Sequence, residues 1–150
     1  MNKLNLDFDP INVAGITCAK LILENGSSSD PDKKKGGHQL LGSLLTRGCG
    51  QFNNIEFAKL VENTGACLRC DTYEDGILIS LKCASEDSVK LIELLGWMLK
   101  DPHFEQTQIN LEKDLTIKAL IRQKENPYYL AFEGWRKIAY GNGPYGHDPL

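Results

Sequence analysis

Two cysteines at close spacing are the first side chains in this sequence that could hold a metal ion. Cys67 and Cys70 have the spacing at which two thiolates on a turn share a metal ion or form a disulfide. In a strand, however, residues three positions apart point to opposite faces, and no second Cys or His pair supplies the remaining ligands. We therefore interpret Cys67 and Cys70 as two packing cysteines.

The histidines are the next candidates for metal binding or proton transfer. His103 follows a proline and His147 lies in a glycine-rich tail, so we interpret both as surface side chains. His38 begins an apolar helix directly after Gly36 and Gly37, a place where a lone histidine is usually structural. The glycines around it do not match a phosphate-binding loop, and no serine or cysteine lies in a recognisable nucleophile elbow.

The composition of the chain restricts its class. It has 150 residues, of which 41% are hydrophobic and 25% charged, and its formal net charge is −3. This is the composition of a soluble globular domain, and its acidic balance argues against a nucleic-acid partner. No apolar stretch is long enough for a membrane span. The five cysteines are an odd number without framework spacing, so we expect an intracellular, cytoplasmic protein with reduced thiols.

Hydrophobic periodicity and turn residues predict the first elements. Residues 11–23 alternate as a largely buried strand, and 27–37 are rich in Ser, Lys, Gly and Pro, which indicates a solvated loop. Leucines at helical spacing predict a short buried helix over 38–47. Asn53 or Asn54 can cap a second helix, which Gly65 ends.

The second half of the chain is predicted to be mainly helical. Segments 67–73 and 76–83 form a hairpin, because the Asp75-Gly76 step favours positive backbone angles. Ser85 can cap a helix that stops before Pro102. A long amphipathic helix over 104–125 follows, and Pro127 both breaks it and starts another helix. Its apolar stripe is Leu111, Leu115 and Ala119, widened by Ile117, Leu120 and Ile121.

This order of elements predicts an α+β fold in which helices pack on one face of an antiparallel sheet. The tail over 140–150 is expected to be irregular, because glycine and proline recur throughout it.

Several segments together resemble one known family. The sequence at 26–31, then Lys-Gly-Gly-His-Gln-Leu-Leu-Gly at 35–42 and Thr-Arg-Gly at 46–48, resembles the N-terminal signature of the pitrilysin/insulinase family of zinc peptidases. Residues 55–66, 87–99, 102–104, 125–127 and 140–146 are similar to later segments of that family in the same order. The resemblance covers roughly residues 11–150 and implies the peptidase-like half of this family as the fold.

Active members of the family carry an inverted His-x-x-Glu-His motif, in which two histidines one helical turn apart bind Zn²⁺ and the glutamate is the general base. The resemblance aligns this motif with His38, Leu41 and Gly42. The family's third ligand, a glutamate in the long helix, falls at Ala119, Leu120 or Ile121 depending on register. Only His38 is therefore left at a family ligand position. Because catalytic zinc needs three protein ligands, we expect no catalytic residue and no cofactor in this chain, although zinc is the cofactor of the family.

The resemblance also implies a role. Some family members are built from two similar subunits, one with the motif and one without, which together enclose an extended peptide. We expect this chain to be the non-catalytic kind, pairing with a catalytic homologous subunit in peptide processing or degradation. Arginine and tyrosine side chains that contact substrate in some such subunits belong to a C-terminal half, so we assign no such role to Arg122, Arg136, Tyr128 or Tyr129.

The domain organisation and two alternative functions follow from the same resemblance. We expect residues 1–150 to form a single, truncated N-terminal peptidase-like domain with an incomplete sheet and an exposed edge. The first alternative is an active metalloendopeptidase with a displaced ligand set, such as His38 with Cys49 or Glu125. The second alternative is a truncated remnant without activity.

Overall fold

The computed structural model describes residues 5–10 and 15–146, and the elements follow one another in the predicted order. They are β1 (Ile16–Leu23), the 3-10 turns η1 (Ser27–Ser29) and η2 (Asp32–Lys34), α1 (Gly37–Leu44), α2 (Asn54–Asn63), β2 (Cys67–Thr72), β3 (Ile77–Ala84), the 3-10 turn η3 (Ser85–Asp87), α3 (Ser88–Lys100), α4 (Gln106–Gln123) and α5 (Pro127–Tyr140). No described helix is both long enough and apolar enough to cross a membrane.

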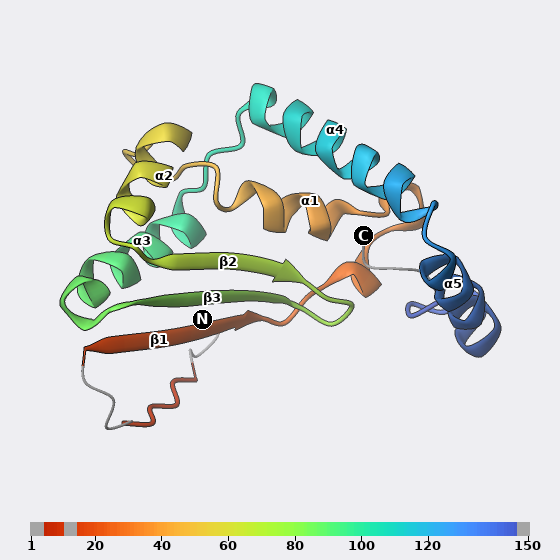
Figure 1. Ribbon diagram of the computed structural model, residues 1–150, viewed down its shortest axis with the longest axis horizontal. Helices are drawn as coiled ribbons and strands as arrows, with labels where there is room; N and C mark the ends of the chain where they lie inside the picture. Colours follow the sequence, from red (N-terminus) through yellow and green to blue (C-terminus); the bar gives the residue numbers. More distant parts are fainter. Residues whose placement is uncertain (1–4, 11–14, 147–150) are drawn as a thin grey trace.

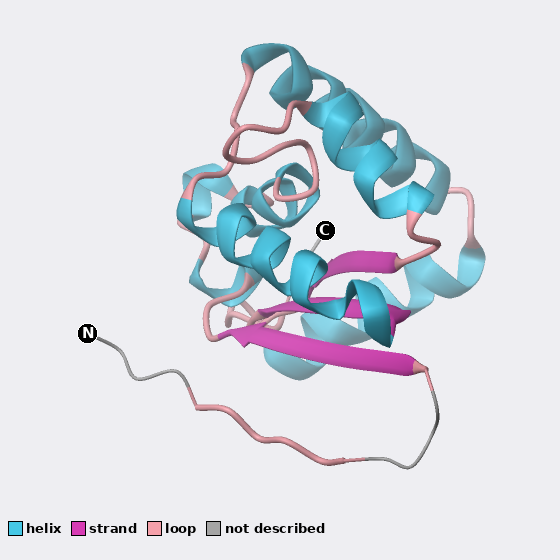
Figure 2. Cartoon of the chain, turned by 90° about the vertical axis from the view of Figure 1, so that its left-hand side faces the viewer, coloured by secondary structure: helices cyan, strands magenta, loops and turns pink. Residues whose placement is uncertain are grey.

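The described strands form one antiparallel sheet in the order β1-β3-β2. Strand β3, which forms the hairpin with β2, therefore lies at the centre of the sheet, and β2 is an edge strand. Figure 1 shows α1 between β2 and α4, with α5 beyond the hairpin end of the sheet, and in Figure 2 most helices lie on one side of the strands. The predicted α+β fold is confirmed.

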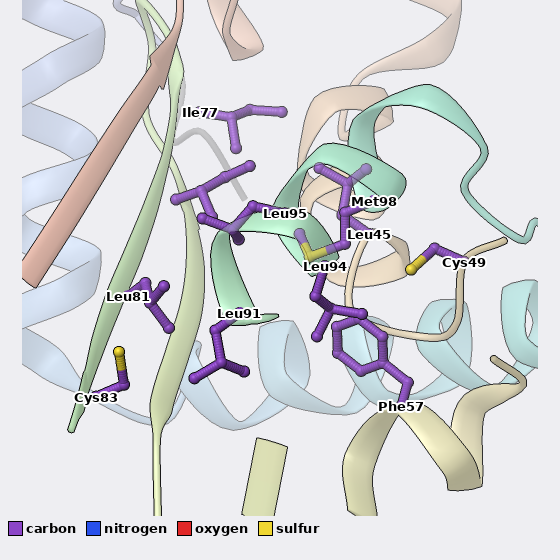
Figure 3. Close-up of a cluster of buried hydrophobic side chains, with 11 residues drawn as sticks. Leu45, Cys49, Phe57, Ile77, Leu81, Cys83, Leu91, Leu94, Leu95 and Met98 are labelled. Carbon is purple, nitrogen blue, oxygen red and sulfur yellow. The ribbon is translucent and has the colours of Figure 1, made fainter. Parts of the chain in front are cut away.

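The core lies between the inner face of β3 and helix α3 (Figure 3). Alternate residues of β3 and one stripe of α3 are buried, and Leu45, Cys49 and Phe57 complete the cluster. The buried residues of the two elements are Ile77, Ile79, Leu81 and Cys83 on β3, and Leu91, Leu94, Leu95 and Met98 on α3. Figure 3 shows Leu91 and Leu95 of α3 on the side of the strands and Leu94 beside Phe57. The burial of this apolar surface is the main force that holds helix and sheet together.

The two faces of β1 differ in exposure, which corrects the prediction of a largely buried strand. Ile16 and Ile22 are exposed, whereas Leu21 and Leu23 are half-buried and pack against the core. The helices cover only the inner face of the sheet, so the outward residues of β1 contact no apolar layer among the described residues. Residues 11–14 of the predicted strand lie outside the described residues.

The helix starts follow the predicted chemistry at two places. The Asn53 side chain accepts hydrogen bonds from the amides of Ile55 and Glu56, and Glu56 bonds back to the Asn53 amide at 3.0 Å, which completes a capping box. Asn126 caps α5, and Pro127 occupies its first turn.

Two predicted local features are wrong. Ser85 does not cap α3 but begins η3, and the Ser88 hydroxyl instead donates to the Ser85 carbonyl at 2.7 Å. The hairpin forms, yet Gly76 does not adopt a positive φ. Glycine is required there by close approach, because a Cβ would lie 2.7 Å from the carbonyl oxygen of Leu23.

The predicted apolar stripe of α4 does not face the core. Leu111, Leu115, Ile117 and Ile121 are exposed, as is Ala119, and only Leu120 of that set is half-buried. The inward side of α4 instead carries Glu112, which is 6% exposed. The helix therefore directs the buried Glu112 toward Arg47 and leaves most of its large apolar side chains exposed.

Candidate functional site

The loop before α1 is built to hold one buried carboxylate. Its first residues pack on the hairpin turn, because the amides of Ser27 and Ser28 donate to the carbonyls of Tyr73 and Glu74 at 3.0 Å. Gly26 allows this contact, since a Cβ there would lie 2.2 Å from the Tyr73 carbonyl oxygen. Asp30, which directly follows η1 in this loop, is only 6% exposed. The prediction of a solvated loop is therefore wrong at Ser27 and Asp30, where hydrogen bonds replace the missing apolar contacts.

Asp30 fixes His38, which the resemblance predicts to be the one residue left at a family ligand position. Its Oδ1 lies 2.6 Å from His38 Nδ1 and accepts from the His38 amide at 3.2 Å, while Oδ2 accepts from the Gly36 amide at 2.8 Å. Burial acts to raise the pKa of Asp30, but the hydrogen bonds and the charge of His38, with the Gly36 amide, hold that pKa below its ordinary value. The histidine thus has a structural partner, which the sequence did not indicate.

The next turn of α1 has no room for a second metal ligand. At Gly42, which the resemblance aligns with the family's second histidine, a Cβ would lie 2.6 Å from the Thr72 hydroxyl oxygen. That hydroxyl also donates to the His38 carbonyl at 3.3 Å, so β2 packs directly against this face of the helix. Leu41, which the resemblance aligns with the glutamate, packs against the hydrophobic core. This face of α1 is therefore a packing surface.

The proposed ligand positions elsewhere do not complete a site. Ala119, Leu120 and Ile121 lie near the end of α4, and none of them has a side chain that can bind a metal ion. Cys49 is fully buried in the core, where burial raises the pKa of its thiol. Within residues 5–10 and 15–146, no group of at least three His, Cys, Asp or Glu side chains lies close enough to hold a metal ion, so His38, Cys49 and Glu125 form no displaced set.

A second buried carboxylate lies between α1 and α4. Arg47, just after α1, contacts Glu112 of α4 with Nη2 and Oε1 2.5 Å apart. Both residues line a cleft of about 320 Å³ that also includes Gly42 and the β2 residues Arg69 and Asp71. The sequence-based prediction missed Glu112 because it followed the apolar residues of α4. The usable signal was the polar row at one-turn intervals, Gln108, Glu112 and Thr116.

The two cysteines of β2 point to opposite faces, as predicted. Cys70 packs against the core, where burial and the nearby Asp71 charge raise its pKa to about 11, so its thiol stays protonated at neutral pH. Cys67 is exposed, so its interpretation as a packing cysteine is wrong. Only one face of β2 is covered, and Cys67 lies on the other.

Of the two remaining histidines, His103 lies among the described residues. His103 is half-buried, and its Nε2 lies 2.8 Å from the Gly50 carbonyl oxygen, so it holds the loop after α1 and is not a free surface side chain. His147 lies outside the described residues.

The arrangement as a whole does not fit a catalytic zinc ion. It offers His38 alone where three protein ligands are needed, and the Thr72 hydroxyl occupies the space that a side chain at position 42 would fill. What the residues do chemically is to fix α1 in place, through Asp30 at its start and Glu112 near its end.

Comparison with known proteins places this geometry in a family. The sequence pattern of the family described as Insulinase (Peptidase family M16) matches residues 14–148. The non-peptidase homolog YmxG of Helicobacter pylori is 25% identical over 130 residues, covering 87% of this chain and 30% of that protein. The mitochondrial-processing peptidase subunit beta of Neurospora crassa is 23% identical over 128 residues, covering 85% of this chain and 27% of that protein. The chain thus spans less than a third of the curated relatives it matches.

Solved structures give the same assignment. A crystal structure of a peptidase M16 inactive domain from Pseudomonas fluorescens superposes with a TM-score of 0.81 at 25% identity, covering 91% of this chain and 33% of that one. A protease from Helicobacter pylori superposes with a TM-score of 0.82 at 19% identity and the same coverage, which shows the shared fold. Because the family pattern matches nearly the whole length of this chain, the chain belongs to the insulinase (M16) peptidase family.

Proposed function

We propose that this chain is a non-catalytic M16 subunit that pairs with a motif-bearing homologue and helps to hold an extended peptide. The observation that carries the proposal is the face of α1, where the resemblance aligns Leu41 and Gly42 with the motif and the Thr72 hydroxyl lies beside Gly42. Without a second ligand or a general base at these positions, His38 cannot activate a metal-bound water molecule.

Exposed apolar surface supports the pairing. Leu111 and Leu115 are exposed on one flank of α4, and Ile117 and Ile121 are exposed on another. Helix α5 adds a row of stacked aromatic rings, with Phe132 at 5.3 Å from Trp135 between ring centroids. Both residues of that pair are themselves more than 40% exposed. Several large apolar side chains exposed on neighbouring helices are typical of protein interfaces.

The edge of the sheet supports the binding of an extended peptide. β2 lies at the edge beside α1, and the cleft between α1, β2 and α4 runs along this edge. An extended peptide can add to such an edge through main-chain hydrogen bonds. In the proposed complex, the motif-bearing homologue supplies the zinc ion and this chain supplies part of the wall around the peptide.

Co-purification with the motif-bearing homologue tests the pairing. We expect a stable complex, and we expect Leu115→Glu to weaken it by about tenfold or more, because a charge would enter an apolar interface. Lys113→Glu, which also changes an exposed residue of α4, is the matched control and should leave pairing unchanged. A homologue that does not associate, or equal losses in the two variants, would contradict the proposal.

A further inference from the structure

A cavity at the far end of α4 is separate from the face of α1 described above. It has a volume of about 760 Å³ and is formed by the loop before α1, the end of α4, one face of α5 and the glycine-rich tail. Its charged lining residues are Lys35, Lys124, Lys137, Asp32 and Glu133. Three lysines therefore face two carboxylates, which leaves an excess of one positive charge.

The ion pairs along the wall identify the lysine that carries this excess. Lys35 Nζ lies 3.5 Å from Asp32 Oδ1, and Lys137 Nζ lies 2.9 Å from Glu133 Oε1. For Lys124, no ion pair is found within the part of the chain that the structure describes. The carbonyl end of α4 stabilises an ammonium group at this position.

The tail gives the cavity a fixed wall. Gly141, Gly143 and Gly146 line the cavity without side chains. The turn that they form is tight, because a Cβ at Gly146 would lie 2.1 Å from the Gly141 carbonyl oxygen. The turn is also anchored, since the Tyr145 hydroxyl donates to Asp75 Oδ1 at 2.6 Å and Arg136 Nε donates to the Tyr145 carbonyl at 3.1 Å. The cavity is therefore formed before any ligand arrives.

We infer that this cavity binds a carboxylate-bearing segment of a peptide, with the carboxylate paired to Lys124. The volume accommodates several residues, and the glycine wall offers backbone groups beside the ammonium group of Lys124, for which residues 5–10 and 15–146 supply no ion-pair partner. This inference rests on the proposed function and deepens it, because it names an acidic segment as part of the peptide that the complex holds.

Two isosteric peptides and the chain alone test the inference. The ¹⁵N-labelled chain is titrated with acetyl-Ala-Glu-Ala-amide and with acetyl-Ala-Gln-Ala-amide, and amide chemical shifts are followed by NMR. We expect the glutamate peptide to shift the amides of Lys124, Gly141 and Gly143, with a dissociation constant in roughly the millimolar range. The glutamine peptide should bind about three- to fivefold more weakly, the size of one exposed ion pair.

Matched lysine variants decide whether the site is specific. Lys124→Gln should remove the preference for glutamate, whereas Lys113→Gln on the same helix should keep it, because Lys113 does not line the cavity. Equal binding of the two peptides, or equal loss in the two variants, would overturn the inference. Since this titration does not involve the homologue, failure here and failure of the pairing experiment are distinguishable.

Discussion

Helices α3 and α4 lie next to each other in the chain and have opposite relations to the core. Helix α3 buries an apolar stripe in which Met98 is 0% exposed, whereas α4 buries Glu112 and leaves Leu115 46% exposed. Both sequences contain apolar residues at helical spacing. The difference shows that an apolar stripe identifies a helix face that favours burial but does not identify the element or subunit that packs on it. In α3 the cover is the sheet, and in the proposed complex the cover of α4 is another subunit.

The largest expected effect is a difference in the free energy of unfolding between an apolar-to-alanine substitution in α3 and one in α4. Met98→Ala in α3 should lower the free energy of unfolding by about 3 kcal/mol, because it removes buried contacts and leaves a cavity. Leu115→Ala in α4 should change it by less than about 0.5 kcal/mol. Urea unfolding of both variants measures the difference. Similar losses would mean that α4 is already covered in the isolated chain.

Position 42 on α1 should not accommodate even the methyl side chain of alanine without a loss of stability. Gly42→Ala places a Cβ 2.6 Å from the Thr72 hydroxyl oxygen and should lower the free energy of unfolding by about 2 kcal/mol. Gly96→Ala in α3 is the control, because its Cβ meets nothing within 4 Å and the change should stabilise the helix by up to about 1 kcal/mol.

A second substitution identifies the source of the strain at position 42. In the double variant with Thr72→Ala, the cost of Gly42→Ala should largely disappear, because the clashing hydroxyl has been removed. Additive losses in a double-mutant cycle would show that the packing of Thr72 is not what excludes a side chain at this position.

The ion pair that docks α4 on α1 should matter more than an exposed pair on the same helix. Glu112→Gln should lower the free energy of unfolding by about 1.5 kcal/mol, because it weakens a contact between Arg47 and a buried carboxylate. Asp114→Asn removes the exposed partner of Lys118 and should cost less than about 0.5 kcal/mol. Thermal unfolding separates the two, and a larger loss for Asp114→Asn would refute the inward orientation of Glu112.

The smallest expected effect is the pH dependence contributed by Asp30. Its pKa in the folded chain is below its ordinary value of 3.8, so its contribution to stability is fully present above pH 3.8 and is lost as the pH falls below that value. Asp30→Asn should cost about 1 kcal/mol at pH 7, and this cost should shrink toward pH 3. Chemical unfolding at the two pH values checks this, with Asp32→Asn as the exposed control. A cost that does not depend on pH would contradict it.

The sequence predicted the parts of the molecule that local patterns determine. The order of the elements, Asn53 as one of two candidate caps and Pro127 in the first turn of α5 follow from residue spacing and backbone chemistry alone. The loss of the metal motif at Leu41 and Gly42 stays a prediction, because it rests on the family resemblance and not on local residue spacing.

Contacts between distant segments were not predictable in this way. Asp30 is buried because the hairpin turn binds the loop that carries it, and α4 faces inward with Glu112 because Arg47 lies opposite. Both depend on residues far away in the sequence, so no local pattern could indicate them. The exposure of Cys67 and Ile22 depends in the same way on which face of the sheet the helices cover.

The central claim is that α1 packs the fold and does not hold a catalytic metal ion. The most direct test is to titrate the purified chain with Zn²⁺ by calorimetry, alongside His38→Ala, and to assay both proteins for peptide cleavage. We predict no stoichiometric zinc binding, no cleavage by the chain alone and no difference between the two proteins. One zinc ion per chain together with cleavage, both lost in His38→Ala while the fold is retained, would contradict the claim.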